Sequence, residues 1–195
     1  MLDQLGVPIY LHRRTLTDVR RRYLNPYRLP AGVDLSGLDL RAFGDEPFRV
    51  DDVPIEEYSR GDRFGIRYQG LSHFGGGSHV GVEIVVLEPG RQSYPAHYHM
   101  LEEEHVLILE GEVTLRLGDK SYELSAGSYA CFPAGQKAGH ALVNNGSSPC
   151  RYLIVGERNP NEVVVHTDSG RVSVRLTGEG YRKSATMDYW EGETT

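Results

Sequence analysis

Short runs of aliphatic residues alternate with turn residues through the middle of the chain. The runs cover residues 80–87, 105–109, 113–117, 152–155 and 163–165. Turn sequences such as Glu88-Pro89-Gly90 separate them. The run at residues 113–117 alternates apolar and polar positions, as a half-buried strand does. Strands that recur at roughly 8–12-residue spacing are typical of antiparallel sandwiches and barrels, not of βαβ proteins. The pattern therefore predicts an all-β domain.

The beginning of the chain has a different pattern. Prolines recur through it, at positions 8, 26, 30, 47 and 54. Between them, the segment from Thr15 to Leu24 predicts one short helix, which Asn25-Pro26 would stop. One helix followed by proline-broken loop is not a helix-turn-helix. We expect residues 1–57 to form an N-terminal arm that packs on the β-domain or on a neighbouring subunit.

The β-domain is expected to span residues 58–157 and to be followed by a C-terminal extension, residues 158–195. From Gly178 onward the extension is polar except for Tyr189 and Trp190, the only tryptophan of the chain. An exposed pair of large aromatic side chains is unusual. We therefore expect these two side chains to dock against another part of the protein.

Composition and charge narrow the class of protein. Of the 195 residues, 39% are hydrophobic and 25% are charged, which is an ordinary balance for a globular protein. The formal net charge of −6 argues against duplex nucleic acid as the main partner, because phosphate binding needs a basic face. No apolar run approaches the roughly 20 residues of a membrane helix. We expect neither a nucleic acid nor a membrane partner.

The N-terminus and the cysteines indicate the compartment. The first eight residues carry an acid at Asp3 and a proline at Pro8, instead of a basic region before an apolar stretch, so we see no secretory signal. Two cysteines, Cys131 and Cys150, are too few for a disulfide framework. A reduced, cytoplasmic protein is the expectation.

Two histidines and a glutamate form the first candidate for chemistry. His97 and His99 are two residues apart, so on a strand both imidazoles point to one face. Glu104 opens the next apolar run, after a gap long enough to turn the chain. A carboxylate beside two imidazoles is costly to bury unless a charge neutralises it, and a divalent metal would do so. Imidazole and carboxylate together suit Zn, Fe, Mn, Co or Ni rather than Ca or Mg.

A second stretch supplies a possible fourth ligand. It runs from Gly127 to Asn144, and its Pro133-Ala134-Gly135 sequence marks a tight turn at a strand end. His140 follows this turn and opens the next short strand.

These two stretches resemble the paired motifs of the cupin superfamily, small β-barrels that hold a metal with three histidines and one glutamate. The first family pattern is G(X)5HXH(X)3,4E(X)6G, and the chain matches it from His97 to Gly111, with six residues instead of five before His97. The second is G(X)5PXG(X)2H(X)3N, and the chain matches it with four residues instead of two before His140. A lengthened turn of this kind is similar to that of small bacterial cupins of the sugar-phosphate-isomerase-like branch. The resemblance covers about residues 60 to 157.

The resemblance implies a fold and a metal site. The fold would be a double-stranded β-helix, the cupin or jelly-roll barrel. One divalent transition metal per chain, Fe, Mn, Ni or Zn, would be held by His97, His99, Glu104 and His140. Four protein ligands would fill a tetrahedral zinc site, whereas an octahedral site would keep two positions open. The first arrangement suits a structural or sensing role and the second suits catalysis.

Neighbouring residues have simpler interpretations. His105 faces the opposite side of its strand from Glu104, so we expect it at the surface or an interface, and we expect Glu102 and Glu103 to be solvated. Tyr98 alternates away from the ligands and should pack in the protein, while Tyr94 could reach the pocket rim. Ordinary loop or strand positions are expected for His73, His79 and His166.

Three other side chains have more than one interpretation. Cys131 shares a strand face with Tyr129, and a buried apolar thiol is the common case for such a cysteine. Arg91 and Lys137 lie in loops beside the two motifs and could bind an anionic group, although solvated loop charges are more frequent.

Three functions compete. The first is a metal-dependent enzyme that isomerises a small oxygen-rich substrate, sugar-like or carboxylate, for which Glu83 is the best remaining carboxylate to act as a base. The second is Fe-dependent dioxygenation, which needs little acid–base machinery from the protein. The alternative is a non-enzymatic cupin that binds or senses a metal or metabolite. In each case we expect a small-molecule ligand and a homodimer.

Overall fold

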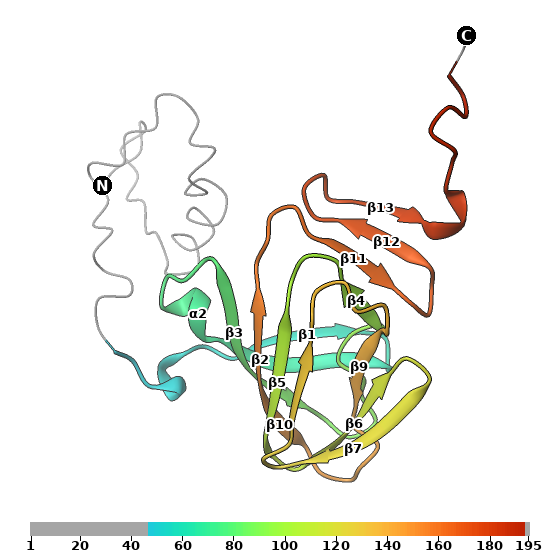
Figure 1. Ribbon diagram of the computed structural model, residues 1–195. Coiled ribbons are helices and arrows are strands. Elements are labelled where there is room, and N and C mark those ends of the chain that lie inside the picture. The colour runs from blue at the N-terminus through green and yellow to red at the C-terminus, as the bar shows by residue number, and fades with distance from the viewer. Residues whose placement is uncertain (1–46, 194–195) are drawn as a thin grey trace, which may run out of the picture.

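Residues 47–193 are described by the computed structural model, and they form strands joined by short loops (Figure 1). The strands are β1 (Glu56–Arg60), β2 (Phe64–Gly70), β3 (Val80–Leu87), β4 (His97–His99), β5 (Glu104–Glu110), β6 (Glu112–Leu117), β7 (Lys120–Ser125), β8 (Tyr129–Phe132), β9 (His140–Val143), β10 (Cys150–Glu157), β11 (Val163–His166), β12 (Arg171–Val174) and β13 (Glu179–Arg182). Short helical turns are η2 (Val50–Asp52), α2 (Leu71–Phe74) and η3 (Lys183–Ala185). None of the helices in this range is long or apolar enough to cross a membrane. The helix expected from Thr15 to Leu24 lies outside the described residues.

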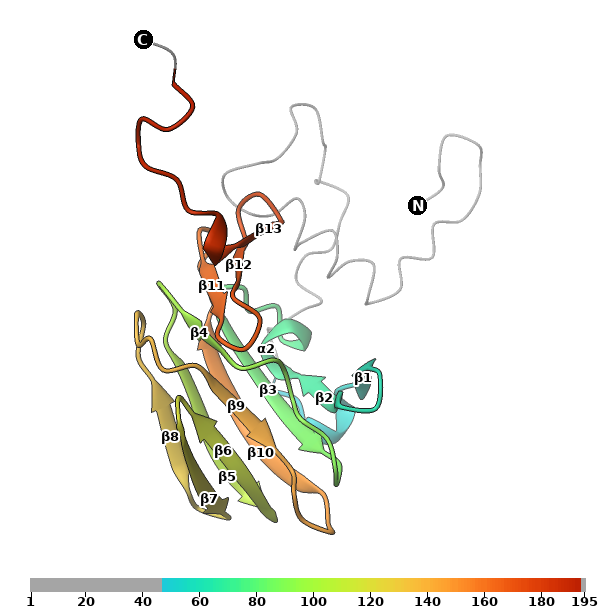
Figure 2. The same cartoon turned by 90° about the vertical axis from the view of Figure 1, so that its right-hand side faces the viewer.

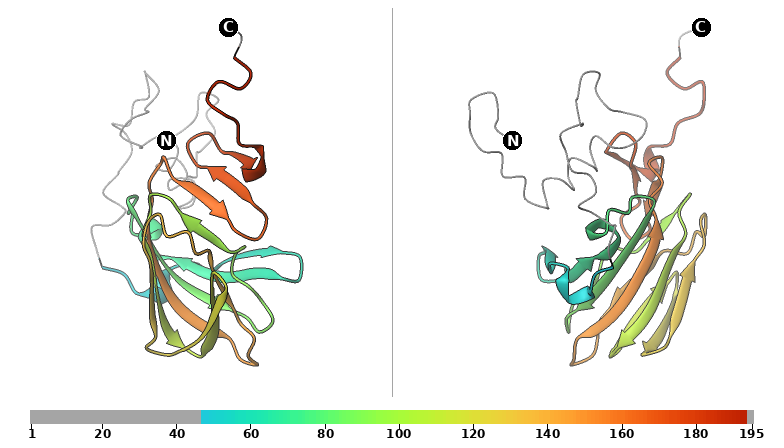
Figure 3. Two further views of the ribbon diagram at one scale, coloured as in Figure 1. Left: turned by 45° about the vertical axis from the view of Figure 1, so that its right-hand side comes forward. Right: turned by 90° about the vertical axis from the view of Figure 1, so that its left-hand side faces the viewer.

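The strands form two antiparallel sheets. One has six strands in the order β1-β2-β3-β10-β5-β8, and the other has seven in the order β13-β12-β11-β4-β9-β6-β7. In the middle of each order, neighbouring strands such as β3 and β10 or β4 and β9 are not consecutive in sequence, so the connections there cross from one sheet to the other. Figure 2 and Figure 3 show the strands of the two sheets from the side. This architecture confirms the all-β jelly roll that the sequence predicts.

The core lies between the inner faces of the two sheets. Its buried members are Ile66, Val85, Leu87, Val106, Ile108, Val113, Leu115, Phe132, Leu142, Cys150 and Tyr152. Each buried aliphatic side chain of this kind contributes about 1.5–3 kcal/mol through the removal of apolar surface from water. On β5, Val106 and Ile108 are two residues apart and both face the core. Glu104, two residues before Val106, lies on the same inner face. Its carboxylate is therefore at one end of the core, where β5 begins.

The C-terminal extension continues the seven-stranded sheet. β11 pairs with β4 through Val164 and His99, and β12 and β13 follow as further antiparallel strands. Figure 1 and Figure 2 show these strands in orange and red beyond β4, with the last described residues leading away from the sandwich. The strand β4 is therefore enclosed by a segment that the sequence pattern placed after the barrel.

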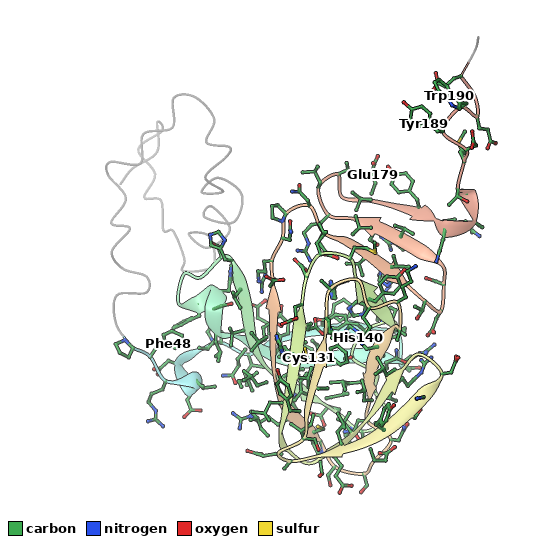
Figure 4. The ribbon with its side chains drawn as sticks, viewed as in Figure 1. Phe48, Cys131, His140, Glu179, Tyr189 and Trp190 are labelled. Carbon is green, nitrogen blue, oxygen red and sulfur yellow. The ribbon has the colours of Figure 1, made fainter. Side chains whose placement is uncertain are left out.

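The aromatic pair near the C-terminus does not dock on the barrel. Tyr189 and Trp190 are 83% and 71% exposed, and each packs on the other with ring centroids 4.8 Å apart. Figure 4 shows both side chains at the far end of the C-terminal segment. The expectation that they pack against another part of the protein is wrong for residues 47–193, because this segment follows η3 away from both sheets.

Replacement of Gly111 by alanine is expected to destabilise the protein by more than about 2 kcal/mol. Gly111 is the single residue between β5 and β6, with φ +77°, and a Cβ there would lie 2.6 Å from the carbonyl oxygen of Pro149. The left-handed conformation alone costs an L-residue roughly 1–2 kcal/mol, and the clash adds to it. Gly90 is the matched control, since it has φ +75° and open space around the Cβ position. Urea unfolding should show a clearly larger loss for Gly111→Ala than for Gly90→Ala, and equal losses would contradict the clash.

Candidate metal centre

Four side chains converge where β4, β5 and β9 meet at one end of the core. They are His97, His99, Glu104 and His140, here called the inner cluster, and their ligand atoms all lie within 4.8 Å of one another. The two β4 histidines share a face, as the sequence predicts. His140 is the direct partner of His97 in the pairing of β9 with β4. Figure 4 labels His140 at this end of the sandwich.

Polar groups outside the inner cluster orient two of its imidazoles. His97 Nδ1 lies 2.8 Å from the carbonyl oxygen of Pro95, and because a carbonyl only accepts, Nδ1 carries the proton. The lone pair of His97 is then on Nε2. His99 places Nδ1 between two carboxylates, 3.4 Å from Glu102 and 3.6 Å from Glu162. Its Nε2 faces the inner cluster, 3.7 Å from Glu104. Both rings thus direct Nε2 inward, and for His97 the hydrogen bond to Pro95 fixes the tautomer that metal ligation needs.

Glu104 and His140 complete the inner cluster. His140 Nε2 lies 3.2 Å from Glu104 Oε1, and the ring of Phe132 stacks on His140 with centroids 3.8 Å apart. Burial opposes the charge of Glu104, but the adjacent imidazoles of His140 and His99 outweigh it, so the pKa of this carboxyl lies well below its ordinary value. Glu104 is therefore an anion at neutral pH.

The donor set fits a divalent transition metal. Among the described residues, both ring nitrogens of His99 and Nδ1 of His140 are buried without a hydrogen-bond partner, and of these Nε2 of His99 faces the inner cluster. Buried polar atoms usually have a partner, and leaving one without costs about 1–3 kcal/mol. An ion bound among three imidazoles and one carboxylate would satisfy the inward-facing donors and neutralise the Glu104 charge. The four residues could hold such an ion.

The metal-free protein is expected to be most stable near pH 6.5. Burial lowers the pKa of His99, but the adjacent carboxylates of Glu102 and Glu104 outweigh it and raise the pKa from 6.5 to about 9, so the stabilising contribution of His99 is lost as the pH rises through 9. Burial and His140 lower the pKa of His97 to about 4. Below pH 6.5, His97 therefore becomes protonated in the unfolded chain but not in the folded protein, which lowers the free energy of unfolding. The low pKa of Glu104 adds a further loss in acid, below its ordinary value of 4.5.

Melting temperatures of the chelator-treated protein between pH 5 and pH 10 test this expectation. The maximum should lie near pH 6.5, with a fall of several degrees on the alkaline side. The metal-loaded protein should lose little on that side, because the metal replaces the proton at Nε2 of His99. Identical profiles with and without metal would contradict the assignment.

A second layer of charged groups lies behind His99, and it corrects one expectation. Glu102 was expected to be solvated, but it is 2% exposed. Arg175 binds both of its carboxylate oxygens, and Asn159 donates its backbone N–H to Oε1. Burial works against the charge of Glu102, but His99 and Arg175 prevail and lower its pKa. The turn before β5 thus folds Glu102 inward, where it pairs with Arg175, the residue that follows β12.

Glu162 is the other member of this layer. It is fully buried, and its two oxygens accept the backbone N–H groups of Met100 at 2.7 Å and Leu101 at 3.0 Å. Glu162 and Arg175 belong to the C-terminal extension, and the sequence analysis assigned a role to neither. An isolated acid and an isolated arginine, 60 and more residues from His99, leave no local signal in the sequence.

Glu83 faces the interior instead of solvent. It precedes buried Val85 by two residues on β3, so both side chains share the inner face. Its carboxylate binds Arg158 at 3.2 Å, and its side chain is 25% exposed. Burial raises the pKa of Glu83, Arg158 counteracts this, and the charges of Glu104 and Glu56 raise it further. A carboxyl group of raised pKa therefore lies within electrostatic reach of the inner cluster.

Tyr94 lies on the same side of the inner cluster. Its ring packs on Tyr58 with centroids 5.7 Å apart and is 37% exposed, which agrees with the expected position at a rim. Burial and the neighbouring Glu83 raise the pKa of Tyr94, so its hydroxyl stays protonated and can donate a hydrogen bond.

Tyr98 and the two loop cations have ordinary surroundings. Tyr98 is buried, as the alternation predicts. Arg91 donates to the carbonyl of Gly61 at 2.8 Å, and Lys137 is exposed, so neither gains support as an anion site.

The remaining histidines lie outside the inner cluster. His73 is in α2 and His79 is an exposed loop residue. His166 is nearer than expected, with its ring 6.0 Å from that of His97, but its Nε2 lies 3.3 Å from Ser173 Oγ instead of joining the four ligands.

Cys131 differs from its expectation. It was expected to be a buried thiol, but it is exposed on β8, the edge strand of the six-stranded sheet. It shares the outer face with Tyr129, as predicted from their spacing, and Tyr129 is 61% exposed. Ala130 and Phe132 of β8 pack in the core, so Cys131 and Tyr129, which alternate with them, point outward.

Comparison with known proteins agrees with this geometry. Residues 83–156 match the model of the cupin domain. No curated protein matches the chain. Among solved structures, the chain is similar to a sugar phosphate isomerase from a cupin superfamily of Silicibacter pomeroyi, with 29% identity, a TM-score of 0.64, and coverage of 75% of this chain and 98% of that one.

Two further solved structures are similar. A proposed sugar phosphate isomerase of Acidithiobacillus ferrooxidans is 27% identical, with a TM-score of 0.61 and coverage of 64% of this chain and 80% of that one. A predicted oxalate decarboxylase of Thermotoga maritima is 21% identical, with a TM-score of 0.51 and coverage of 58% and 100%. At that identity the last similarity bears on the fold alone.

Proposed function

We propose that the inner cluster of this chain, which carries a match to the cupin domain at residues 83–156, binds one divalent transition metal and that the protein isomerises a small sugar-like substrate there. The observation that carries the proposal is the convergence of three imidazoles and one carboxylate within 4.8 Å. The similarity to two proteins named as sugar phosphate isomerases supports the substrate class.

A metal bound at this position would polarise a substrate carbonyl and make a neighbouring hydroxyl or C–H group more acidic. Isomerisation of a sugar also needs a group that removes a proton from one carbon and returns it to the next. Glu83 is the interior carboxyl group best suited to this task. The pKa of Glu83 is raised toward neutral pH, which suits a group that both takes up and releases a proton. The Arg158 guanidinium lies 3.2 Å from the Glu83 carboxylate and fixes its orientation.

Tyr94 has a complementary role in this proposal. Its hydroxyl remains protonated because burial and Glu83 raise its pKa. At the half-exposed rim it can donate a hydrogen bond to a substrate oxygen and orient the substrate between the inner cluster and Glu83. The interior carboxyl favours isomerisation over dioxygenation, which needs no such proton carrier.

Metal content tests the first half of the proposal. Elemental analysis of protein purified without an affinity tag or added metal is expected to find about one manganese, iron, nickel or zinc per inner cluster. If the protein binds none of these ions even after incubation with each, the metal site and the isomerase proposal both fail.

Glu83→Gln is expected to lower turnover by about 100-fold or more without reducing the metal content. The amide keeps the shape of the side chain and its contact with Arg158 but cannot carry the proton. The measurement is incorporation of solvent deuterium into a panel of aldose and ketose phosphates, followed by NMR. Glu88→Gln is the control, because Glu88 pairs with Arg67 at the surface and should leave exchange unchanged. Full exchange in Glu83→Gln would exclude Glu83 as the proton carrier.

A further inference from the structure

A second set of metal-ligating side chains lies on the opposite face of β5. Glu103, His105 and Cys131, here called the outer cluster, have ligand atoms within 4.8 Å of one another. His105 on β5 is the direct cross-strand partner of Cys131 on β8, and Glu103 precedes His105 by two residues on the same side. Since Glu104 faces the core, the sheet separates the outer cluster from the inner cluster.

The arrangement of His105 favours ligation through one defined nitrogen. Its Nδ1 lies 2.5 Å from the hydroxyl of Tyr129, and the two rings stack with centroids 5.9 Å apart. Its Nε2 lies 2.9 Å from Glu103 Oε1. The hydroxyl fixes the ring from behind in the way that an outer partner orients a ligating histidine. Nε2 of His105 and the Glu103 carboxylate are therefore close enough to bind one ion together.

The spacing of the three donors is within reach of a metal ion. In a tetrahedral site with bonds of about 2.0–2.3 Å, ligand atoms are roughly 3.3–3.8 Å apart. The ligand atoms of the outer cluster lie within 4.8 Å of one another, so small side-chain rotations would bring them to this spacing. Cys131 and Glu103 are at the surface, where such rotations meet little resistance. A sulfur, a nitrogen and a carboxylate oxygen are the ligands that zinc and other thiophilic divalent ions accept.

The surroundings add charge and space. A groove of about 380 Å³ adjoins the outer cluster, and its lining residues are Val80, Glu103, His105, Ala134, Val155, Gly156 and Glu157. The carboxylate of Glu157 accepts the backbone N–H of Glu103 at 3.0 Å, so a second anion lies beside the three donors. The lining contains two carboxylates and no lysine or arginine, which favours a cation.

We propose that the outer cluster is a second metal site, which binds a thiophilic divalent ion such as zinc through Glu103, His105 and Cys131. The groove leaves the fourth coordination position to water or to a small ligand. This site is independent of the proposed function, because it shares no ligand with the inner cluster.

Sulfur coordination makes the outer cluster separately observable. The inner cluster has no sulfur ligand, so a thiolate-to-metal charge-transfer band in the ultraviolet reports the outer cluster alone. The other cysteine of the chain, Cys150, is fully buried in the core and out of reach. The experiment is a titration of the full-length, reduced, metal-free protein with Cd²⁺ and with Co²⁺, followed by absorbance.

The wild-type protein should develop the band with one equivalent bound at the outer cluster. Cys131→Ser should abolish it, and His105→Gln, which removes a ligand, should weaken binding by more than about 100-fold. Both positions face outward, so melting temperatures should stay near that of the wild type. His97→Ala should keep the band, since it changes only the inner cluster. Elemental analysis after zinc loading should give two ions per chain for the wild type and one for each single-site variant.

The outcomes separate the two sites. A wild type that shows the band but binds only one ion would retain the outer site and contradict the inner one. Absence of the band in the wild type, or its persistence in Cys131→Ser, would overturn the outer site. Tyr129→Phe is a further control, because it keeps all three ligands and should retain the band with weaker binding.

Discussion

His97→Ala is expected to remove the metal from the inner cluster, whereas His166→Ala is expected to leave it bound. His97 presents Nε2 inward because Pro95 holds its Nδ1 proton, so alanine removes one of four donors. Loss of an outer partner alone typically weakens metal binding by about 10–100-fold, and loss of a ligand should exceed about 100-fold. Elemental analysis and competition titration of the tag-free proteins provide the measurement.

The control is close in space and in chemistry. His166 stands opposite His97 in the pairing of β11 with β4, and its ring is 6.0 Å away, yet its Nε2 faces Ser173. If removal of any histidine from this region were enough to lower the metal content, both variants would lose the metal to the same extent. Equal metal content in the two variants, either full or absent, would show that the ligand assignment is incorrect.

Glu162→Gln should weaken metal binding by about 10–100-fold and lower the free energy of unfolding by about 1–3 kcal/mol. The carboxylate accepts the N–H groups of Met100 and Leu101 and lies 3.6 Å from Nδ1 of His99. A neutral amide has one acceptor oxygen, so one buried donor loses its partner and the His99 ring loses a charge that orients it. Both effects follow from one substitution.

Two measurements distinguish positioning from mere stability. Titration with the inner-cluster metal gives the affinity, and urea unfolding of the metal-free protein gives the stability. Glu110→Gln is the control: Glu110 pairs with Arg151 at the surface, its side chain is 69% exposed, and its removal should change stability by less than about 0.5 kcal/mol. If Glu162→Gln loses stability but binds metal as tightly as the wild type, Glu162 supports the fold and does not position His99.

The parts of the site that could be predicted from sequence are those fixed by strand alternation. His97 and His99 share a face, Tyr98 between them is buried, and Glu104 and His105 point to opposite sides of β5. The period of two along a strand determines each of these directions once the strand is recognised. The resemblance to the paired cupin motifs then implied His140 as the fourth member of the set.

The layer behind His99 could not be predicted in this way. Glu102 was interpreted as solvated because it precedes a strand, and its burial depends on Arg175, which is 73 residues away. Such a pair exists only after β11 has joined β4 and carried the extension back over the turn. The burial of Cys131 was wrongly predicted for a different reason: alternation identifies which residues share a face, but it does not identify which of the two faces packs on the core, and on β8 that face is the one with Ala130 and Phe132.

The pairing of β4 also determines when the inner cluster can form during synthesis. β4 is three residues long and pairs with β9 at His97 alone, whereas β11 pairs with all three of its residues. A chain emerging from the ribosome can assemble β3, β5 and β10 as soon as residue 157 is free, but the strand that carries two of the four donors stays poorly held. Metal capture is therefore expected to be a late event in biogenesis, and nascent chains stalled before Val163 should fold their core while remaining unable to retain the ion.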